Sequence, residues 1–353
     1  MANPNLTPLE DALEHLLSKA PVVAQTETVA LTDALGRVLA ENHHVPADVP
    51  PADNSAVDGY ALRKQDLSGD QPVPVSARIP AGAAPNALAP GTAARIFTGS
   101  EIPEGADSVV MQERVQVTDS GIVVESEVEE GQNIRRRGQD LARGDLALAK
   151  GTKVRPNEMG LLASMGVARI DVLARLRVAI LSTGDELVDP GTPLGPGQIY
   201  NSNRFTLMGL LAEAGCEVVL CETLRDKREA TRETLLRAAE SADLIITSGG
   251  VSVGEEDHVR AVLEESGGLS LWKMAIKPGK PVAFGAIGGT PVLGLPGNPG
   301  SVLVTFLMVG MPYIRKRQGR SPKPLSGERI PADFSVSSPS VRREFVRARK
   351  EIR

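Results

Sequence analysis

The stretch ADLIITSGGVSVGEED, at residues 242–257, joins an apolar run to three glycines and three acids. The run ADLIITSGG is typical of a buried strand that ends in a tight turn. Such a turn lets the backbone approach an anion, although this one lacks the Lys-Ser/Thr ending of a P-loop and does not match GxGxxG. On this stretch alone, an anion site and a simple turn whose acids cap the next helix are equal alternatives.

Strands and helices alternate around this stretch. RVAILSTG (177–184) and CEVVLCETL (216–224) have the apolar character of buried strands, and SNRFTLMGLLAEAG (202–215) and KREATRETLLRAAES (227–241) have that of helices. Alternation at this spacing predicts a parallel-rich sheet between two helical layers, which is a three-layer α/β domain. Ligands bind such sheets at the carboxyl ends of the strands, so the loops after the strands form the candidate site.

The whole chain predicts a multidomain α/β protein. Residues 54–140 contain short strands separated by turns, which is typical of a β-rich domain. In the segment before it, TVALTDALGRVLA (28–40) predicts a strand followed by a helix. Four parts are expected: a small mixed α/β linker domain formed by 1–46 with 141–174, an inserted β-rich domain at 47–140, the three-layer α/β domain at 175–318, and the incomplete start of a C-terminal β domain at 319–353.

Composition argues against several classes of protein. The chain has 353 residues, of which 41% are hydrophobic and 24% charged, as in a globular protein. Aromatic residues make up 3% and the net charge is −5, which argues against nucleic-acid binding. The two cysteines, Cys216 and Cys221, are too few for a disulfide framework and have no partners for a zinc site.

One long uncharged segment raises the question of a membrane span. Residues 281–314 carry no charged side chain, a length that could cross a bilayer. Prolines and glycines interrupt the segment, which instead predicts two buried strands, the turn LPGNP and a buried helix. The N-terminal stretch 7–20 has apolar residues at helical spacing and is not a signal peptide. We therefore expect a cytoplasmic protein without a membrane segment.

Acidic residues follow the predicted parallel strands. Asp185 and Glu186 follow the first strand, Asp226 follows the second, and Asp257 lies in the loop after the third. Each acid alone is more often a helix cap or a solvated turn residue. Gathered at one sheet edge, they predict a hard cation such as Mg²⁺, held partly by the phosphates of a substrate.

Lysines and a helix start lie near the end of the same domain. In WKMAIKPGKP (272–281), Lys273 and Lys277 are in phase on one side of an extended strand, and Lys280 follows a stiff turn. Lysine suits phosphates and oxyanions, so these residues favour an anion site over a solvated face. In LPGNPGS, Asn298 can cap a helix that begins at Pro299, whose N–H groups could face the same anion or simply start the helix.

The β-rich region has its own candidates. Asp58 lies in the turn-like stretch PADNSAVDGYA, and the triplet Arg135, Arg136 and Arg137 precedes Gly138 and Asp140. Arginine triplets usually form solvated faces, but beside a glycine and an acid this one could bind a phosphorylated ligand. The four histidines suggest no catalytic dyad, and no Ser-His-Asp triad can be assembled from these motifs.

Eight motifs together resemble one family. They are DNSAVDGYA, RIFTG, GQNIRRRGQD, STGDEL, GQIYNSN, SGGVSVGEED, KMAIKPGKP and GLPGNP, in that order. The chain resembles the molybdopterin molybdenumtransferase family, called MoeA in bacteria, to which the gephyrin E domain of animals is related. The resemblance runs from about residue 6 to 350 and is carried by long, specific motifs.

The resemblance implies an activity, substrates and partners. Family members insert molybdenum from molybdate into adenylylated molybdopterin, release AMP and form molybdenum cofactor, with a divalent metal such as Mg²⁺ assisting. It implies an α/β domain of the molybdopterin-binding type and a homodimer whose cleft is shared between subunits. It also implies transient contact with other cofactor-biosynthesis proteins and with molybdoenzymes, and no nucleic-acid or membrane partner.

The motifs place functional residues in this sequence. By the resemblance, the expected catalytic residues are Asp58, Asp140, Glu186, Asp226, Asp257, Lys273 and Lys277, of which Glu186, Asp226 and Asp257 are the expected metal ligands. Thr98, Pro296 and Pro299 are further cleft residues by motif match. The residue-level reading adds substrate-binding candidates: Arg135, Arg136, Arg137, Ser248, Gly249, Gly250, Ser252, Gly254, Lys280, Gly297 and Asn298.

Two other functions remain open. A molybdopterin adenylyltransferase of the neighbouring step shares the α/β domain but lacks the β-rich insertion. A non-catalytic scaffold is the second alternative, against which the retained acids and lysines argue. Nucleic-acid docking on the basic C-terminal part is disfavoured, since Phe334 and Phe345 are its only aromatic residues. The sequence departs from the family at Gly300, where valine is common, and at GQDL, where GEDI is usual.

Overall fold

The computed structural model describes residues 6–251, 258–266, 269–322, 327–336, 338 and 340–351. The chain forms two compact units. The first, which we call the α/β unit, comprises Met1–Ala40, Gly151–Arg155 and Ile170–Arg353, and the second, the β-rich unit, comprises Glu41–Lys150 and Pro156–Arg169. The division into four domains that the sequence predicts remains a prediction.

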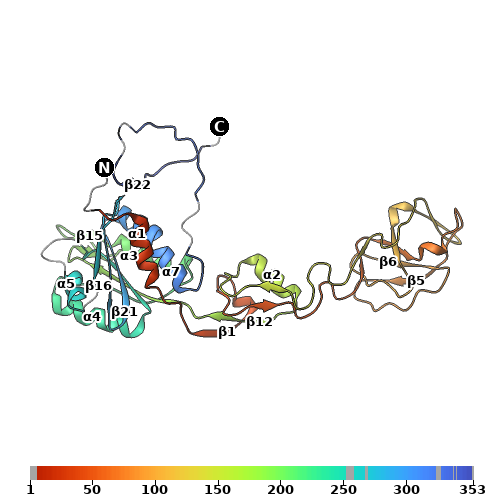
Figure 1. The fold of residues 1–353 in the computed structure, drawn as a ribbon, viewed down its shortest axis with the longest axis horizontal. Helices are drawn as coiled ribbons and strands as arrows, with labels where there is room; N and C mark the ends of the chain where they lie inside the picture. Colours follow the sequence, from red (N-terminus) through yellow and green to blue (C-terminus); the bar gives the residue numbers. More distant parts are fainter. Residues whose placement is uncertain are drawn as a thin grey trace. The chain divides into compact units, whose positions relative to one another are not determined.

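A mixed sheet organises the α/β unit (Figure 1). Within the described residues it has six strands in the order β16-β13-β17-β21-β20-β18, with the bounds β13 Arg177–Thr183, β16 Glu217–Leu224, β17 Leu244–Ser248, β18 Ser270–Lys273, β20 Pro281–Ile287 and β21 Thr290–Leu295. The first four strands in this order are parallel. Strand β20 is antiparallel to β21, because the glycine turn at 288–289 that joins them is too short for anything but a hairpin, and β18 is antiparallel to β20.

Helices cover both faces of this sheet. They are α1 Leu9–Ser18, α3 Ser202–Glu213, α4 Arg228–Ser241, α5 His258–Glu265, α6 Pro299–Thr305 and α7 Met311–Arg317, with the π-helix Phe306–Gly310 joining the last two. Alternate residues of β13 point to opposite faces, so Ile180 packs in the core with α3 and Phe306, while Leu181 packs in the core with α4 and α5. The three layers predicted from the alternating pattern are therefore present.

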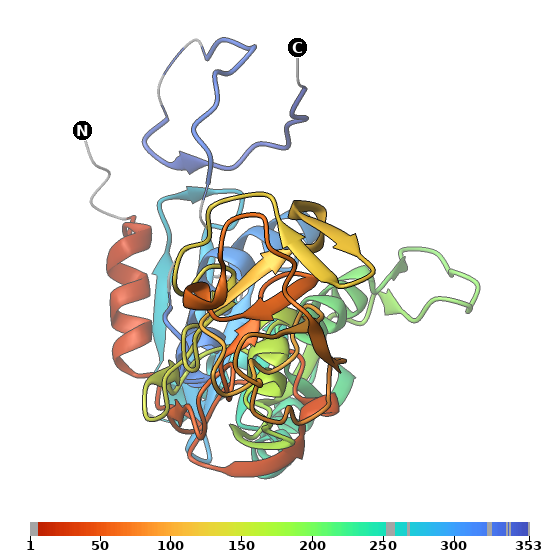
Figure 2. The ribbon, with the colours of Figure 1, turned by 90° about the vertical axis from the view of Figure 1, so that its right-hand side faces the viewer.

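Smaller strand pairs complete the α/β unit. They are β1 Thr26–Ala30 with β12 Arg169–Leu173, β14 Leu187–Val188 with β15 Ile199–Tyr200, and β19 Ile276–Lys277 with β22 Arg343–Glu344. Figure 2 shows the β14–β15 ribbon and its loop extending away from the main sheet. No described helix is long and apolar enough to cross a membrane. The uncharged segment 281–314 instead forms β20, β21 and the helices that follow them, as predicted.

One predicted helix is absent. The stretch TVALTDALGRVLA forms the end of β1, the 3-10 helix η1 Leu31–Asp33 and an extended segment. Gly36 has a φ of +80°, which a helix does not allow, and Val38 and Leu39 form bridges to Lys153 and Val172. Pairing with distant segments thus overrides the helical spacing of the apolar residues.

The β-rich unit, every residue of which is described, consists of short strands as predicted. Its main sheet has the order β5-β6-β4-β7, with β4 Gly59–Leu62, β5 Val75–Ile79, β6 Ala93–Ile96 and β7 Ser108–Met111. Around it lie β2 His43–His44 with β11 Leu146–Leu148, β3 Asn54–Ser55 with β10 Ile134–Arg135, β8 Val115–Thr118 with β9 Gly121–Val124, the 3-10 helices η2 Lys64–Asp66 and η3 Gln112–Arg114, and helix α2 Pro156–Ser164. Apolar residues on the two faces of β4, such as Ala61 and Leu62, are fully buried.

Candidate functional site

The carboxyl ends of the four parallel strands meet at one edge of the main sheet. Register pairs Thr183 with Leu224, Ser182 with Ser248, and Ser248 with Leu295, so the four strands end side by side. The loops that follow them therefore emerge together, as the sequence predicts. They carry the acids at 185–186 and 226, the glycines at 249–250 and the turn at 296–298.

A cavity of about 470 Å³ lies among these loops. It contains six of the predicted substrate-binding residues, Gly249, Gly250, Lys280, Pro296, Gly297 and Asn298. It also contains Val251, Pro278, Gly279, Pro281, Ser301 and Arg342, which the sequence did not single out as site residues. The signal for Arg342 was the basic C-terminal stretch, but that stretch was considered only as a surface for nucleic acid.

Glycine is required at two positions of the cavity wall. Gly249 and Gly250 have φ values of +89° and +68°, in the region that favours glycine. A Cβ at Gly249 would lie 2.4 Å from Thr183 Oγ1, so any side chain would clash. Gly297 lies against this loop, because its Cβ would be 3.7 Å from the Gly249 Cα. The two glycine loops therefore adjoin with little side-chain bulk between them.

Two acids from neighbouring strand ends lie together. The backbone N–H of Asp185 donates to Asp226 Oδ2 at 3.4 Å, and the backbone N–H of Asp226 donates to Asp185 Oδ1 at 3.3 Å. Both residues and Glu186 are exposed. The residue that contacts Asp226 is thus Asp185, next to the predicted ligand Glu186. Residues 252–257 lie outside the described part of the chain. Among the residues that are described, no group of three acids, histidines or cysteines could hold a metal ion.

Three predicted residues, Ser252, Gly254 and Asp257, lie outside the described residues. The metal-ligand assignment of Glu186, Asp226 and Asp257 therefore stays a prediction. Asp185 and Asp226 supply oxygen ligands of the kind that Mg²⁺ accepts, but two carboxylates alone leave most of its octahedral positions to water and substrate oxygens.

The predicted lysines differ in their surroundings. Lys273 ends β18, whereas Lys277 lies in β19, so the two are not in one continuous strand. Met274 and Ile276 are buried between them and both lysines are exposed, while the anion contact that the sequence favours for them remains a prediction. The Lys277 Nζ lies 3.2 Å from Glu344 Oε1, and this hydrogen bond lowers the pKa of Glu344. In the described part of the chain, only Lys280 of the three lines the cavity.

In the β-rich unit, the predicted residues Asp58 and Thr98 are in direct contact. The backbone N–H and the hydroxyl of Thr98 each donate to Asp58 Oδ1, at 2.8 Å. The backbone hydrogen bond lowers the pKa of Asp58 most, the hydroxyl hydrogen bond adds to it, and the charge of Arg95 contributes least. Asp58 is therefore held as a carboxylate, a form suited to binding cations or accepting hydrogen bonds.

Each arginine of the triplet is paired with an acid. The ion pairs are Arg135 with Asp140 at 2.5 Å, Arg136 with Asp53 at 2.6 Å and Arg137 with Asp48 at 2.6 Å. The pKa of Asp53 is lowered first by the backbone N–H of Arg137 and then by the side chain of Arg136. The phosphate contact predicted for this triplet remains a prediction, and it would compete with these ion pairs.

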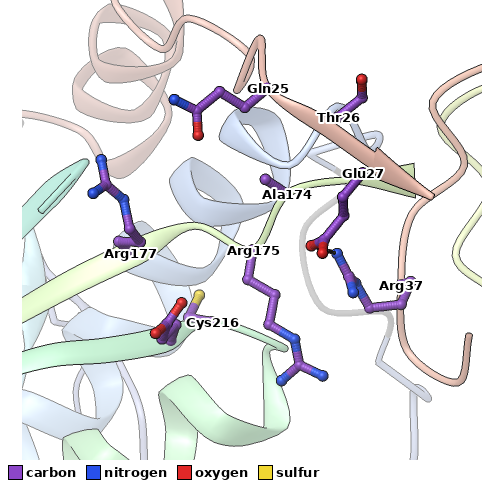
Figure 3. A pocket seen from close by; sticks show the side chains of 9 residues that line it. Gln25, Thr26, Glu27, Arg37, Ala174, Arg175, Arg177 and Cys216 are labelled. Carbon is purple, nitrogen blue, oxygen red and sulfur yellow. Dashed lines mark hydrogen bonds and ion pairs between the residues drawn. The ribbon is translucent and has the colours of Figure 1, made fainter. Parts of the chain in front are cut away.

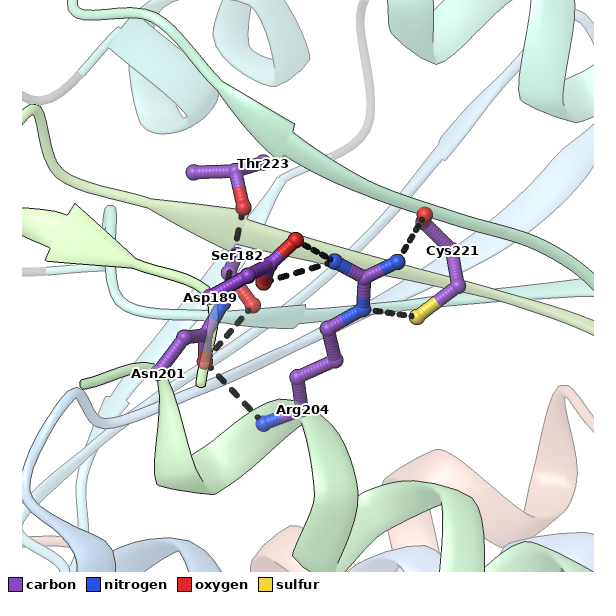
Figure 4. Close-up of polar contacts among 6 residues, drawn as sticks. All are labelled: Ser182, Asp189, Asn201, Arg204, Cys221 and Thr223. Carbon is purple, nitrogen blue, oxygen red and sulfur yellow. Dashed lines mark hydrogen bonds and ion pairs between the residues drawn. The ribbon is translucent and has the colours of Figure 1, made fainter. Parts of the chain in front are cut away.

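Side chains at the start of α3 connect the strand ends (Figure 4). The Asn201 side chain caps α3 by accepting from the Arg204 N–H at 3.1 Å. Asn201 also contacts the hydroxyls of Ser182 and Thr223, at 3.4 and 3.5 Å. The Arg204 guanidinium donates to both Asp189 carboxylate oxygens and to the Cys221 backbone carbonyl, and its Nε lies 3.0 Å from the Cys221 Sγ. These contacts fix α3 and the β14 segment against β13 and β16.

A larger cavity, of about 910 Å³, lies at the opposite ends of the strands (Figure 3). Its lining includes Arg37, which is 8% exposed, binds Glu27 and donates to the Leu173 carbonyl at 3.0 Å. Its Cys216 thiol is buried, and burial raises its pKa to about 12, so it is not a nucleophile at neutral pH. The cavity lies between β1 and the first residues of β13 and β16.

Comparisons with known proteins agree on one family. The model of the MoeA N-terminal region (domain I and II) matches residues 7–166, and that of the probable molybdopterin binding domain matches residues 179–316. A molybdopterin molybdenumtransferase of Haemophilus influenzae is 45% identical over 314 residues, which cover 88% of this chain and 78% of the relative.

Further relatives extend the match. Molybdopterin molybdenumtransferase 2 of Mycobacterium tuberculosis is 42% identical over 337 residues, covering 91% of this chain and 82% of the relative. The crystal structure of the molybdopterin biosynthesis MoeA protein from Pyrococcus horikoshii OT3 aligns with a TM-score of 0.77 and 32% identity, covering 90% of this chain and 80% of that one. The chain belongs to the MoeA family of molybdopterin molybdenumtransferases.

Proposed function

We propose that the chain inserts molybdenum into adenylylated molybdopterin, with molybdate as the second substrate, AMP as the released product and molybdenum cofactor as the other product. The observation that carries this proposal is the cavity at the carboxyl edge of the sheet, where glycine loops, Lys280 and Arg342 meet. Relatives with this activity in their names cover most of the chain. The match at 7–166 includes the β-rich region that the adenylyltransferase alternative lacks.

The cavity residues suit the anionic parts of these substrates. Lys280 and Arg342 supply two positive charges from different segments, and the guanidinium can bind an oxyanion through two hydrogen bonds. Gly249, Gly250 and Gly297 leave room for a phosphate or oxyanion to lie against the backbone. Lys277 and Lys273 are proposed to act at the mouth of this site, where Lys277 would exchange its contact with Glu344 for substrate.

We propose Mg²⁺ as the assisting metal. Asp185 and Asp226 are the described residues that would hold it, with Glu186 beside them and Asp257 as the further predicted ligand. When bound, the ion would neutralise phosphate charge on the substrate. The carboxylates' own role would be to supply oxygen ligands at the strand ends.

We further propose that the protein acts in the cytoplasm as a homodimer. The family resemblance supports a cleft that takes Asp58, Thr98 and Asp140 from one protomer and the α/β-unit residues from its partner. Asp58, Thr98 and Asp140 are exposed or partly buried, and Asp58 is ionised, as a shared cleft would need. The same resemblance supports transient contacts with other cofactor-biosynthesis proteins and with molybdoenzymes.

A direct assay tests the proposed reaction. The purified chain is incubated with adenylylated molybdopterin, Mg²⁺ and molybdate, and AMP is measured by chromatography. AMP release that depends on molybdate is expected. A parallel incubation with molybdopterin, ATP and Mg²⁺ without molybdate tests the adenylyltransferase alternative. Consumption of ATP there, with no molybdate-dependent AMP release in the first assay, would refute the proposed function.

A further inference from the structure

Asn203 lies in the first turn of α3 and contacts two separate strand ends. Its Nδ2 donates to the carbonyl oxygen of Gly297 at 2.6 Å and to the hydroxyl of Ser248 at 2.9 Å. A carbonyl oxygen can only accept, so the atom that faces Gly297 must be the amide nitrogen. The orientation of this side chain is therefore set by its partner.

One partner of Asn203 lines the 470 Å³ cavity, and the other directly precedes two residues that line it. Ser248 ends β17 and is followed by Gly249 and Gly250, which line the cavity, and Gly297 lines it directly. Asn203 is not itself a lining residue in the described part of the chain. Any effect of Asn203 on a ligand must therefore pass through these two loops.

The glycine loops need such a connection. Their bases are joined by a backbone hydrogen bond from the Gly249 N–H to the Leu295 carbonyl at 3.0 Å, next to the Ser248–Leu295 pair that ends the β17–β21 ladder. Beyond that bond, Gly249, Gly250 and Gly297 have no side chains with which to hold one another. Helix α3 is a rigid support, because Leu207 and Leu211 are fully buried and Asn201 caps its start.

We propose that Asn203 is a positioning residue that sets the spacing between the two glycine loops and thereby shapes the anion-binding cavity. The identity of the ligand rests on the proposed function, whereas the effect on the loops does not. A single amide with two donated hydrogen bonds determines how far the loop after β17 stands from the loop after β21. A site held within a fraction of an ångström by such a support binds its ligand without first having to order the loops.

Two substitutions separate the contacts of Asn203. Asn203→Asp keeps the shape of the side chain but cannot donate to the Gly297 carbonyl. The Ser248 hydroxyl could still donate to the new carboxylate. Asn203→Ala removes both hydrogen bonds. The matched control is Ser202→Ala, because Ser202 is the neighbouring exposed residue of the same turn. Thermal unfolding of all three variants, compared with the wild-type protein, reports how much of each remains folded at the assay temperature.

Steady-state kinetics give the first readout. We expect Asn203→Asp and Asn203→Ala to raise KM for adenylylated molybdopterin about tenfold, the order expected when one well-formed hydrogen bond is lost. Ser202→Ala should leave it unchanged. A merely structural role would lower the folded fraction, which reduces the apparent kcat and leaves KM as it was. A reduced kcat with an unchanged KM in both Asn203 variants would overturn the proposal.

Hydrogen exchange gives a second readout that does not depend on the reaction. In the ligand-free protein, Asn203→Ala should accelerate exchange of the Gly249 amide, which donates to the Leu295 carbonyl between the two loops, about tenfold, with no change in the β-rich unit. Unchanged exchange in these loops, or acceleration spread over the whole chain, would refute the positioning role. If the wild-type chain releases no AMP, the proposed function fails, and the exchange data still decide what Asn203 does.

Discussion

Thr98 donates two hydrogen bonds to a single oxygen of Asp58, one from its backbone N–H and one from its hydroxyl, both 2.8 Å long. Asp58 immediately precedes β4 and Thr98 lies two residues after β6, and the two strands are antiparallel neighbours. The sheet therefore brings together two residues that are distant in the sequence. Because both bonds favour the charged carboxylate, they lower the pKa of Asp58.

The first prediction concerns this pKa. Thr98→Val removes the hydroxyl bond but keeps the backbone bond, so the pKa of Asp58 should rise part of the way toward its ordinary value of about 3.9. A lowered pKa contributes stability above the ordinary value, which is lost as pH falls through the folded-state value. In Thr98→Val this contribution should be smaller, and its loss should be complete at a higher pH than in the wild-type protein, because the folded-state pKa is closer to the ordinary value.

Carbon-13 NMR of the Asp58 carboxyl from pH 2 to 6 measures the shift. Asp53 is the internal control, because its low pKa comes from Arg137 and Arg136 rather than from Thr98. An Asp58 titration that is the same in both proteins would show that the hydroxyl bond is not formed in solution.

The second prediction distinguishes two lysines of one motif. Lys280 lines the cavity, whereas Lys277 pairs with Glu344 at 55% exposure of its side chain. Lys280→Gln should therefore raise the molybdate concentration needed for half-maximal AMP release more than Lys277→Gln does. A tenfold difference is about 1.4 kcal/mol, within the range of one charge-assisted contact.

Lys277→Gln also provides the matched control for this comparison, since it removes the same charge a short distance away. An exposed ion pair such as Lys277–Glu344 contributes about 0–1 kcal/mol to stability, so both variants should unfold near the wild-type temperature. If Lys277→Gln raises the half-maximal molybdate concentration more than Lys280→Gln does, the oxyanion binds beside β19 and not in the cavity.

Sequence patterns predicted the α/β layers well because β13, β17 and β21 are buried on both faces, which produces long apolar runs. Parallel pairing of these strands was enough to predict that the loops after them meet at one edge of the sheet. The sequence predicted that Asp58 and Thr98 belong to the same cleft but not that they are in contact. The register that pairs two antiparallel strands cannot be deduced from either strand alone.

What the sequence did not reveal depends on contacts between distant segments. Arg342 reaches the cavity from the C-terminal stretch because β22 pairs with β19, and a two-residue strand leaves no periodic signal. Asn203 looks in the sequence like any polar residue at the start of a helix. Its partners Ser248 and Gly297 become its neighbours only in the folded sheet. In the sequence the arginine triplet resembles an unpaired cationic patch, because the acid that pairs with each arginine is identified only in the structure.

The third prediction contrasts two glycines. Gly249→Ala should destabilise the protein by more than about 1 kcal/mol, because its φ is +89° and the new Cβ would lie 2.4 Å from Thr183 Oγ1. Gly300→Ala should stabilise it by about 0.5–1 kcal/mol, because Gly300 lies in α6 and its Cβ would meet only Asn298 Oδ1, at 3.6 Å. Thermal unfolding measures both changes, and a destabilised Gly300→Ala would show that the helix start needs glycine.

The fourth prediction separates the two cysteines. Cys216 is 6% exposed and burial raises its pKa to about 12, so little of this thiol is thiolate at pH 8. Cys221 is partly exposed and lies beside the Arg204 guanidinium. Iodoacetamide at pH 8 should therefore alkylate Cys221 first in the native protein. Peptide mass spectrometry over time checks the order of alkylation. In urea, both cysteines should react at similar rates, and equal rates in the native protein would contradict the prediction.

The last prediction tests the shared cleft. Asp58→Ala and Lys280→Ala proteins are mixed under conditions that exchange subunits, at a molybdate concentration low enough that neither variant alone releases measurable AMP. If each cleft takes Asp58 from one protomer and Lys280 from its partner, a mixed dimer has one wild-type cleft and one cleft with both lesions. Random exchange makes half the dimers mixed, so roughly a quarter of wild-type activity should return for a closed two-fold dimer.

A second pair of variants supplies the control for this exchange. Asp58→Ala and Asp140→Ala both alter the β-rich unit, so in their mixed dimers every cleft keeps one lesion and no activity should return. Copies with two different affinity tags verify that mixed dimers form. Mixed dimers of the first pair without recovered activity would mean that Asp58 and Lys280 do not complete one cleft from two chains, and a protein that is monomeric by light scattering would exclude the shared cleft altogether.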